Sequence, residues 1–481
     1  MIYRDIIIIG GGAAGLMAAI GAGNALRHSG AGKIPESARP LVLEKMPRPG
    51  RKIMITGKGR CNFTNFKEWN GFSEHVHPNP RPLRPAFYNL SPEKLTEMLG
   101  NAGLETVVER GDRAFPASHR AADVVDTLVR MVRESGAEIR CGEEAVSITV
   151  PDTETVLAGN EGNGHFRIEC SGGQSYCCRN LIITTGGLSY PASGSTGDGL
   201  AWARRNGIAV KSTFPSLTAI VPAGYKAAVS RNLSEDRAIS GKSSTGDLKG
   251  HIDRSTPLSA KGKALAGIRL KNIGLSVTVD GSTVYDDTGD IDFTDGGLEG
   301  PLGFRVSRKC VNAILNGSKV SAHIDLKPAV SQEELEARIT RLWQEISEDS
   351  RSTGKKYGER FGILLGKLMP RELTAGFLHC NQGTDHKTLA RKLKDWKMDI
   401  AGYVGYERCV ITAGGIDTSA IIPGTMECRK IRGLYFAGEI LDLDGDTGGY
   451  NLHIAFSTGY LAGQSAAASV IQARAFPSLQ V

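Results

Sequence analysis

The chain has 481 residues, a formal net charge of +7, 60 glycines and nine cysteines. This length allows two or three domains around a large core, and the mildly basic balance permits an anionic cofactor or RNA without requiring either. The cysteines form no C-x-x-C pair, which argues against a zinc site, a disulfide framework and a dithiol reductase, and favours reduced thiols in a cytoplasmic protein that holds no metal.

The first predicted element is an apolar strand that runs into a glycine-rich turn. Ile6–Ile9 are consecutive isoleucines, typical of a parallel strand buried on both faces. Gly10, Gly12 and Gly15 follow in the spacing G-x-G-x-x-G, and Leu16–Ile20 continues as a helix. This order predicts a dinucleotide site with the pyrophosphate at the helix N-terminus.

The same region contains an uncharged run, Ile6–Gly23, which raises the alternative of a signal peptide or a membrane span. Its six glycines are explained by the strand, the turn and the helix. Arg4 and Asp5 make a poor basic flank for a signal peptide. We therefore expect neither a targeting segment nor a membrane partner.

A second strand, Leu41–Leu43, ends at Glu44, where dinucleotide folds place an acid on the adenosine ribose. Glu44 follows Gly15 by 29 positions (44 − 15), more than the usual ~20. The polar loop Ser29–Pro40 accounts for the excess. The alternative is a surface glutamate at the end of a strand.

The next stretch, Pro49–Asn65, mixes Arg51, Lys52, Lys58 and Arg60 with glycines and small hydrogen-bonding side chains. This composition suits a loop that wraps along a diphosphate and a flavin ring, with backbone amides and side chains as donors. It would also suit a loop that contacts RNA.

Several further elements complete the first part of the chain. We expect helices over Leu90–Leu99 and Ala121–Glu134, and a turn at Arg113–Pro116. Strand regions are expected over Ala137–Val150 and Leu181–Gly187. The glycine-rich run Pro191–Gly199 has no G-x-G-x-x-G unit of its own, so we expect no separate nicotinamide domain.

The middle third reads as a β-rich piece that carries a helical piece. Ala223–Lys263 is polar and poor in aromatic residues, which predicts a long mobile insertion. Short strands follow over Ile268–Tyr285, and helices are expected over Glu333–Ile346 and Lys387–Trp396.

The last hundred residues return to buried strands with glycine turns. Cys409–Ile416 and Gly433–Glu439 are predicted strands. Gly448–Leu452 then opens a long helix of small and apolar residues that runs through Ala473.

These pieces together resemble the BaiN-like bacterial flavoproteins, often described as NAD(P)/FAD-dependent or aminoacetone-oxidase-family oxidoreductases. The motifs that carry the resemblance are Gly10–Gly15, Gly50–Asn65, Thr184–Gly199 and Gly433–Gly463. The resemblance implies an α/β fold with a discontinuous Rossmann-like FAD-binding domain, an inserted β-barrel-like domain and a small helical domain. The expected boundaries are 1–200 and 401–481 for the FAD-binding domain, 201–325 for the β-rich domain and 326–400 for the helical one.

The resemblance also implies FAD held by both ends of the chain, with Glu44 on the adenosine ribose and Glu439 on the ribityl chain. A helix N-terminus at Gly449 would stabilise negative charge on the reduced flavin by a few tenths to ~2 kcal/mol. The expected cofactor-binding residues are Gly10, Gly12, Ala13, Ala14, Gly15, Glu44, Lys45, Arg51, Lys52, Asn62, Thr64, Asn65, Val146, Thr185, Gly186, Gly187, Gly438, Glu439, Gly448, Gly449, Asn451 and Leu452.

The chain departs from the family pattern in the run Phe293–Pro301. Members tend to carry a phrase like FTHxGLSGP, whereas here Asp295 replaces the histidine and Glu299 the serine. If that histidine touches substrate in the family, this departure puts the substrate or the proton chemistry of this chain in doubt.

The chemistry that the resemblance implies is hydride transfer from reduced flavin to a C=C bond conjugated to a carbonyl, with NAD(P)H as electron donor. A steroid-type enone and a uracil of ribosomal RNA, which would become dihydrouridine, both fit this chemistry. The alternatives are a flavin amine oxidase acting on a small aminoketone and a non-enzymatic RNA-binding flavoprotein. No DNA partner is expected, and the oligomeric state stays open.

An acid must protonate the second carbon of the reduced bond. The candidates are Cys61, Tyr190, Tyr450, His453 and Asp295. Cys61 and Tyr450 lead, because their motifs bracket the expected flavin from the two ends of the chain. Each candidate has a structural alternative: a buried thiol for Cys61, a packed ring for Tyr190 and a core histidine for His453.

Overall fold

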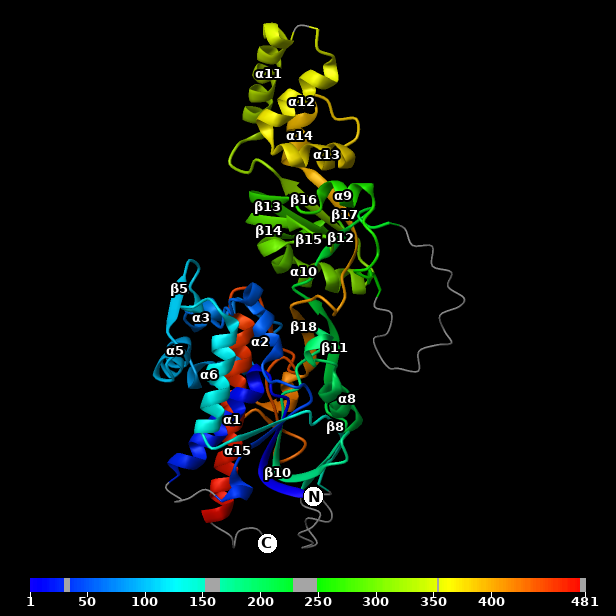
Figure 1. Cartoon of the computed structure of the whole chain (residues 1–481). Coiled ribbons are helices and arrows are strands. Elements are labelled where there is room, and N and C mark those ends of the chain that lie inside the picture. The colour runs from blue at the N-terminus through cyan, green and yellow to red at the C-terminus, as the bar shows by residue number, and fades with distance from the viewer. Residues whose placement is uncertain (30–34, 152–164, 228–248, 353, 476–481) are drawn as a thin grey trace, which may run out of the picture. The chain divides into compact units, whose positions relative to one another are not determined.

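The computed structural model describes residues 1–29, 35–151, 165–227, 249–352 and 354–475 (Figure 1). The chain divides into two compact units, Met1–Phe214 with Ile411–Val481, and Pro215–Val410. The predicted α/β class is confirmed, with a Rossmann-type sheet in the first unit and a barrel in the second. Part of the predicted insertion over 223–263, namely 228–248, lies outside the described residues.

The first unit is built on a parallel sheet in the order β21–β10–β1–β2–β7. The isoleucine run lies in the central strand, where Ile7 is paired with Leu181 on one side and Leu41 on the other. Both neighbours are fully buried, as expected for strands covered on both faces. The strand bounds are β1 Ile2–Ile9, β2 Leu41–Glu44, β7 Glu138–Cys141, β10 Ser175–Ile183 and β21 Leu434–Phe436.

Antiparallel strands extend this sheet beyond β21, branch from the side of β10, and form smaller sheets beside it. They are β8 Ala145–Thr149, β9 Phe166–Cys170, β19 Ile421–Ile422 and β20 Glu427–Cys428 in the main sheet, β3 Thr64–Asn65, β5 Thr106–Glu109 and β6 Arg113–Pro116 in a second sheet, and β4 Val76–His77 with β22 Asp444–Gly445 in a third. The expected turn at Arg113–Pro116 is therefore wrong, because these residues pair with β3 and β5 as a strand.

Helices α1 (Ala13–His28) and α15 (Tyr450–Ala475) lie side by side, which joins the two ends of the chain (Figure 1). Their approach depends on glycine. A Cβ at Gly459 would come within 2.2 Å of the Ala14 carbonyl oxygen, and one at Gly463 within 2.0 Å of the Ala18 carbonyl oxygen. The small residues of the last predicted helix therefore serve close helix packing.

The remaining α-helices that the structure describes in the first unit are α2 Arg51–Ile55, α3 Trp69–Ser73, α4 Arg84–Asn89, α5 Pro92–Asn101, α6 Ala121–Glu134 and α8 Asp198–Arg205. The predictions for α5 and α6 are confirmed, and the Ser91 side chain caps α5 by accepting from the Lys94 amide at 3.4 Å. The Pro49–Asn65 stretch, expected as a loop, contains the short helix α2 and a 3₁₀ turn over Thr56–Gly59.

The chain leaves the first unit along β11 (Val210–Ser216) and returns along β18 (Ile411–Ile416), and these two strands pair. The second unit between them is a closed barrel in the order β12–β15–β14–β13–β16–β17. Its strands are β12 Ile220–Pro222, β13 Arg269–Val279, β14 Ser282–Phe293, β15 Leu298–Glu299, β16 Val320–Asp325 and β17 Trp396–Tyr403.

Helices α9 (Ala260–Leu265) and α10 (Gly300–Leu315) flank the barrel, and α10 is tied to β14 by the 2.7 Å ion pair of Arg305 with Asp287. The helices α11 Gln332–Glu348, α12 Tyr357–Leu368, α13 Arg371–Cys380 and α14 Leu389–Lys394 gather at one end of it (Figure 1). Strand β17 begins within the range 326–400 expected to be helical and ends beyond it, at Tyr403. The helical piece is thus inserted between the last two strands of the barrel.

Candidate functional site

The glycine-rich turn between β1 and α1 has the geometry of a phosphate cradle. Gly10 has a left-handed φ of 102°, and a Cβ there would meet the Thr184 carbonyl oxygen at 2.6 Å. A Cβ at Gly15 would meet the Gly10 carbonyl oxygen at 1.8 Å. At Gly12 a Cβ would meet no described atom within 4 Å. The protein backbone therefore packs closely against Gly10 and Gly15, whereas space is left beside Gly12.

Helix α1 leaves its N-terminus available to an anion. Its cap, Gly12, makes no side-chain hydrogen bond, and its first turn, all of it described, carries no acidic residue. A helix N-terminus presents unpaired amides and partial positive charge, which attract a diphosphate. The donor chemistry here fits the pyrophosphate of FAD.

Glu44 lies at the end of β2 beside this turn. Its carboxylate accepts from the Gly11 amide at 2.6 Å and from the Met46 amide at 2.7 Å. Burial raises the pKa of Glu44, against the effect of these two amides. The neighbouring Lys45 pairs with Asp198 at 2.6 Å, so the second strand is linked to the start of α8.

Lys52 and Glu439, predicted separately from opposite ends of the chain, form an ion pair of 2.7 Å. The Lys52 ammonium also donates to the Ser189 hydroxyl at 2.9 Å, and that hydroxyl donates to Glu439. Glu439 further accepts from the Thr412 amide at 3.0 Å. This network, which we call the Lys52–Glu439 network, joins four segments of the first unit.

The predicted Thr64 and Asn65 also contact the last helix. The Asn65 amide donates to the carbonyls of Gly111 at 3.0 Å and Gly448 at 3.1 Å. A Cβ at Gly449 would meet the Thr64 carbonyl oxygen at 2.4 Å, so only glycine fits there. Asn451 holds the same loop, because its side chain donates to the Gly445 carbonyl and accepts from the Gly445 amide, both at 2.7 Å.

Two further predicted residues carry buried polar atoms that are unsatisfied. Among the described residues, Asn62 Oδ1 and Thr185 Oγ1 have no hydrogen-bond partner. A buried polar atom costs about 1–3 kcal/mol when left unpaired. These atoms are compatible with a polar ligand, and Gly186, with its left-handed φ of 74°, follows Thr185 directly.

Arg51 is exposed at the start of α2, and its charge opposes the burial that raises the pKa of Glu44. Other predicted residues are not part of this gathering. Val146, in β8, has 56% of its surface exposed. Asp295 belongs to the second unit. There its carboxylate pairs with Arg408 at 2.7 Å and Arg254 at 3.0 Å.

The predicted proton donors differ in their exposure to solvent and in their protonation state. Cys61 is fully buried, and burial raises its pKa to about 12. His453 is also fully buried, accepts or donates at Thr64 Oγ1 over 2.9 Å, and packs against the rings of Phe72 and Phe87. Burial lowers the pKa of His453 to about 3, so its ring is neutral at neutral pH.

Asp295 is held in its ionised form, because hydrogen bonds from Arg408 and Arg254 outweigh the opposing effect of burial and lower its pKa. Tyr450 is almost completely buried, and burial together with the nearby Asp446 raises its pKa. Tyr190 is half-buried and has a left-handed φ of 49°. A role for any of the five stays a prediction.

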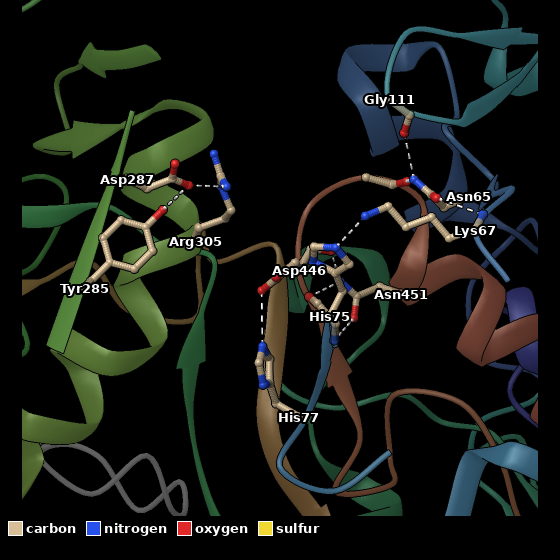
Figure 2. Close-up of polar contacts among 12 residues, drawn as sticks. Asn65, Lys67, His75, His77, Gly111, Tyr285, Asp287, Arg305, Asp446 and Asn451 are labelled. Carbon is tan, nitrogen blue, oxygen red and sulfur yellow. Dashed lines mark hydrogen bonds and ion pairs between the residues drawn. The ribbon is translucent and has the colours of Figure 1, made fainter. Parts of the chain in front are cut away.

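The structure reveals a polar cluster that the sequence reasoning missed. Lys67, His75, His77 and Asp446 form a connected chain of side chains at the strand pair β4–β22 (Figure 2). The signal available in the sequence is the spacing His75-Val76-His77, which places both rings on one face of an extended segment. Among the described residues no group of three or more His, Cys, Asp or Glu is arranged to hold a metal ion.

No helix within the described part of the chain is both long and apolar enough to span a bilayer. A family model described as "HI0933-like protein Rossmann domain" matches residues 4–465.

Three curated relatives match nearly the whole chain. A "3-dehydro-bile acid delta(4,6)-reductase" of Clostridium scindens is 28% identical and is covered to 98%, with 96% of this chain aligned. A "Ribosomal RNA dihydrouridine synthase" of Escherichia coli is 26% identical over 96% of this chain and 97% of the relative. A protein of the same name from Haemophilus influenzae is 27% identical over 95% of this chain and 97% of the relative.

Proposed function

The chain belongs to the HI0933-like Rossmann family, and from this premise we propose that it is an FAD-dependent oxidoreductase that reduces a C=C bond conjugated to a carbonyl. One observation carries the proposal. Two relatives with unlike substrates, a bile acid and ribosomal RNA, have names that describe saturation of the same type of bond. The steroid double bonds and the uracil C5=C6 bond are both conjugated to a ring carbonyl.

The residues that would hold FAD are those of the first unit. The turn Gly10–Gly15 would bind the pyrophosphate, Glu44 the adenosine ribose, and the Lys52–Glu439 network the ribityl and ring region. Gly448 and Gly449 would place the N-terminus of α15 at the flavin, where partial positive charge favours a reduced, anionic ring. Bound FAD supplies hydride, and NAD(P)H is the proposed source of its electrons.

The chain itself must then bind the enone, exclude water and deliver one proton to the α-carbon. Lys58 and Arg60, within the Pro49–Asn65 stretch, are basic and would suit an RNA substrate as well as a cofactor phosphate, although Arg60 pairs with Glu109 and lies over the Phe115 ring. A steroid would need apolar surface instead. Met54 and Ile55 at the end of α2 are exposed by 43% and 48% and would provide such surface.

Two functions compete with this proposal. An amine oxidase of a small aminoketone would use the same flavin with O₂ as acceptor. A non-enzymatic RNA-binding flavoprotein would bind RNA in a salt-sensitive way without turnover. We propose the reductase because the names of the Clostridium scindens and Escherichia coli relatives, a delta(4,6)-reductase and a dihydrouridine synthase, both imply reduction of a double bond.

The test uses the full-length purified protein loaded with FAD under anaerobic conditions. NADPH or NADH should reduce the flavin, and a 3-oxo-Δ4 bile acid or a uracil-containing ribosomal RNA fragment should then reoxidise it. Reduction by aminoacetone alone would favour the oxidase. Failure to bind FAD would overturn the proposal.

A second measurement separates the two substrate classes. Mass spectrometry of ribosomal RNA from a deletion strain should show the loss of one dihydrouridine if RNA is the substrate, with its return when the gene is restored. Unchanged ribosomal RNA together with enone-driven flavin reoxidation would assign the protein to small-molecule reduction.

A further inference from the structure

Asn62 stands between two residues whose backbone is fixed. The Cys61 amide donates to the Thr56 carbonyl at 3.1 Å, and the Phe63 amide donates to the Ala114 carbonyl at 3.0 Å. The side chains of Cys61 and Phe63 are fully buried. Cys61 also has a left-handed φ of 57°, a conformation that is unfavourable for a residue with a Cβ and that the surrounding contacts must therefore impose. The loop thus limits the directions that are open to the Asn62 side chain.

The side-chain oxygen of Asn62 lies beside the N-terminus of α15. A Cβ at Gly449 would come within 2.8 Å of Asn62 Oδ1, so this oxygen packs over the residue that precedes the helix. The oxygen is buried, and no group in the described part of the chain donates a hydrogen bond to it. An amide oxygen can accept two hydrogen bonds, and buried acceptors in folded proteins almost always have a donor. Asn62 Oδ1 is therefore available to a donor from a ligand.

The two other asparagines predicted at the cofactor are already occupied by the protein. Asn65 donates to two backbone carbonyls, and its oxygen accepts from the Lys67 amide at 3.2 Å (Figure 2). Asn451 donates to the Gly445 carbonyl and accepts from the Gly445 amide. Both side chains hold the loops in which they lie. Of these three asparagines, all of them described, only Asn62 keeps a buried oxygen without a donor.

Among the predicted cofactor residues that the structure describes, the one other unpaired buried side-chain atom is Thr185 Oγ1. A Cβ at Gly199 would meet this hydroxyl at 2.3 Å, which places it against α8. The Thr64 hydroxyl is paired, since it lies 2.9 Å from His453 Nδ1. The acceptor beside α15 is therefore supplied by Asn62 and by none of these hydroxyls.

Hydrogen-bond donors lie next to this acceptor. Helix α15 has 26 residues, and the amides of its first turn have no partner within the helix. The first turn, all of it described, carries no acidic residue. The Gly449 carbonyl accepts from the His453 amide at 3.2 Å, so the amides before His453 remain at the open end of the helix. One buried acceptor thus lies beside several backbone donors.

This arrangement complements the pyrimidine edge of a flavin ring, on which the N3–H donor lies between the carbonyl oxygens at C2 and C4. We propose that Asn62 Oδ1 accepts the hydrogen bond of N3–H, while amides at the N-terminus of α15 donate to the C2 oxygen. The inference rests on the proposed function, which brings FAD to this unit. The bond fixes which edge of the ring faces α15 and takes no part in hydride transfer. It makes Asn62 the residue that selects a ring with a free N3–H.

Other donors of FAD suit this oxygen less well. The ribityl hydroxyls both donate and accept, and the Lys52–Glu439 network, which contains both kinds of group, is proposed for them. The adenine amino group belongs to the adenosine half, which is proposed to lie at Glu44. Within the ring, N3–H is present in oxidised flavin, whereas N5–H exists only after reduction. An acceptor for N3–H therefore acts on the oxidised cofactor, which can be measured.

The first test combines a change in the cofactor with a change in the protein. Oxidised FAD and 3-methyl-FAD, in which a methyl group replaces the N3 hydrogen, are titrated into the full-length protein freed of flavin, with flavin fluorescence as the signal. The unaltered protein should bind 3-methyl-FAD at least about 10-fold more weakly than FAD, because the methyl group removes the donor and leaves Asn62 Oδ1 unpaired. In Asn62→Ala, FAD should bind about 10-fold more weakly, and the preference for FAD should fall below about threefold.

Two further variants make this comparison decisive. Asn62→Asp keeps an acceptor at the same place and should retain a preference for FAD over 3-methyl-FAD of at least about 10-fold. Asn70→Ala, which changes an exposed asparagine in α3, is the matched control and should leave both affinities within about twofold. Circular dichroism compares the folding of the variants. If Asn62→Ala does not fold, a preference below about threefold in the unaltered protein or in Asn62→Asp still overturns the inference.

A second measurement separates N3–H from N5–H. Because N3–H is present in both redox states, Asn62→Ala should weaken the binding of oxidised and reduced FAD by factors that agree within about threefold, and the reduction potential should change little. Normal binding of oxidised FAD by Asn62→Ala, together with a lowered reduction potential, would assign the acceptor to N5–H and overturn the inference.

The outcomes also separate this inference from the proposed function. If the unaltered protein does not bind FAD, both are overturned. If it binds FAD with the expected preference but neither an enone nor uracil reoxidises the reduced flavin, the proposed reaction fails and the assignment of Asn62 stands. Equal binding of FAD and 3-methyl-FAD by the unaltered protein, or an undiminished preference in Asn62→Ala, overturns the assignment of Asn62 alone.

Discussion

Lys52 and Glu439 stand 387 positions apart in the chain, and their charged groups lie 2.7 Å apart in the folded protein. The pair is largely shielded, with side-chain exposures of 23% and 11%. Ser189 bonds to both partners, and the Thr412 amide donates to the carboxylate. The contact is one of the places at which the two ends of the chain close into a single unit.

Removal of the cation should therefore cost more than the loss of a surface pair. Lys52→Met leaves a mostly buried carboxylate without its charge partner, and we expect the free energy of unfolding to fall by about 1–3 kcal/mol. We also expect weaker FAD retention. Urea unfolding and FAD titration measure the two effects.

The control for this variant is Lys211→Met, which removes an ion pair of 2.9 Å with Asp417 in the same unit. The Lys211 side chain is 58% exposed, so solvent screens this pair and we expect a much smaller loss of stability than in Lys52→Met, with FAD binding unchanged. Equal losses of stability in the two variants would show that the Lys52–Glu439 network contributes no more to stability than an exposed ion pair.

Substitutions at two glycines should separate folding from cofactor binding. Gly12→Ala adds a methyl group where no described atom lies within 4 Å, so the free energy of unfolding should stay within about 0.5 kcal/mol of the unaltered protein. FAD affinity should fall about tenfold or more, because the methyl group enters the space expected for the phosphates. Gly15→Ala would clash with the Gly10 carbonyl and should destabilise the fold itself. Calorimetry with and without FAD compares them, and full FAD affinity in Gly12→Ala would contradict the placement of the pyrophosphate.

The buried His453 should make stability pH-dependent below neutrality. Its pKa is lowered from 6.5 to about 3, so between these values the unfolded chain binds a proton that the folded chain does not. Stability should thus fall as the pH drops from about 6.5 toward 3, by up to about 1.4 kcal/mol per pH unit from this group. Over this range, the urea midpoint should change less steeply with pH in His453→Gln than in the unaltered protein. In His28→Gln, the pH dependence of the midpoint should match that of the unaltered protein.

Cys61 and Tyr450 are the leading proton donors predicted from the sequence, and each is tested by its own substitution. We expect Cys61→Ala to keep flavin reoxidation by an enone within about threefold, because a sealed thiol with a pKa of about 12 has no access to substrate or solvent. A loss of about 10²-fold with FAD still bound would restore Cys61 as a proton donor.

Tyr450→Phe keeps the ring that stacks on His75 and contacts Phe72, so we expect the fold to be stable within about 1 kcal/mol. The variant isolates the hydroxyl group. A decrease of 10²–10⁴-fold in enone reoxidation, with an unchanged melting temperature, is the result expected of a donor, whereas full activity would assign the tyrosine to packing.

Much of the fold followed from local patterns. The isoleucine run, the spacing of Gly10, Gly12 and Gly15, and the amphipathic repeat of Ala121–Glu134 predicted β1, the cradle and α6, since these features depend on neighbours within a few positions. Arg113–Pro116 was missed as a strand although it forms a hairpin with its sequence neighbour β5, because its other partner, β3, lies far earlier in the chain and meets it only in the folded protein. The last barrel strand along the chain, β17, pairs with the distant strands β12 and β16 and begins within the range 326–400 that the sequence predicts as helical.

By itself, the sequence determined the α/β class, the phosphate cradle and the separate motifs at both ends of the chain, because backbone conformation and hydrophobic period are encoded locally. Only the tertiary structure decided which of those motifs meet. It paired Lys52 with Glu439, buried Cys61 and His453, and assembled Lys67, His75, His77 and Asp446. Such contacts join residues hundreds of positions apart, and their distances and solvent access depend on the packing of the whole unit.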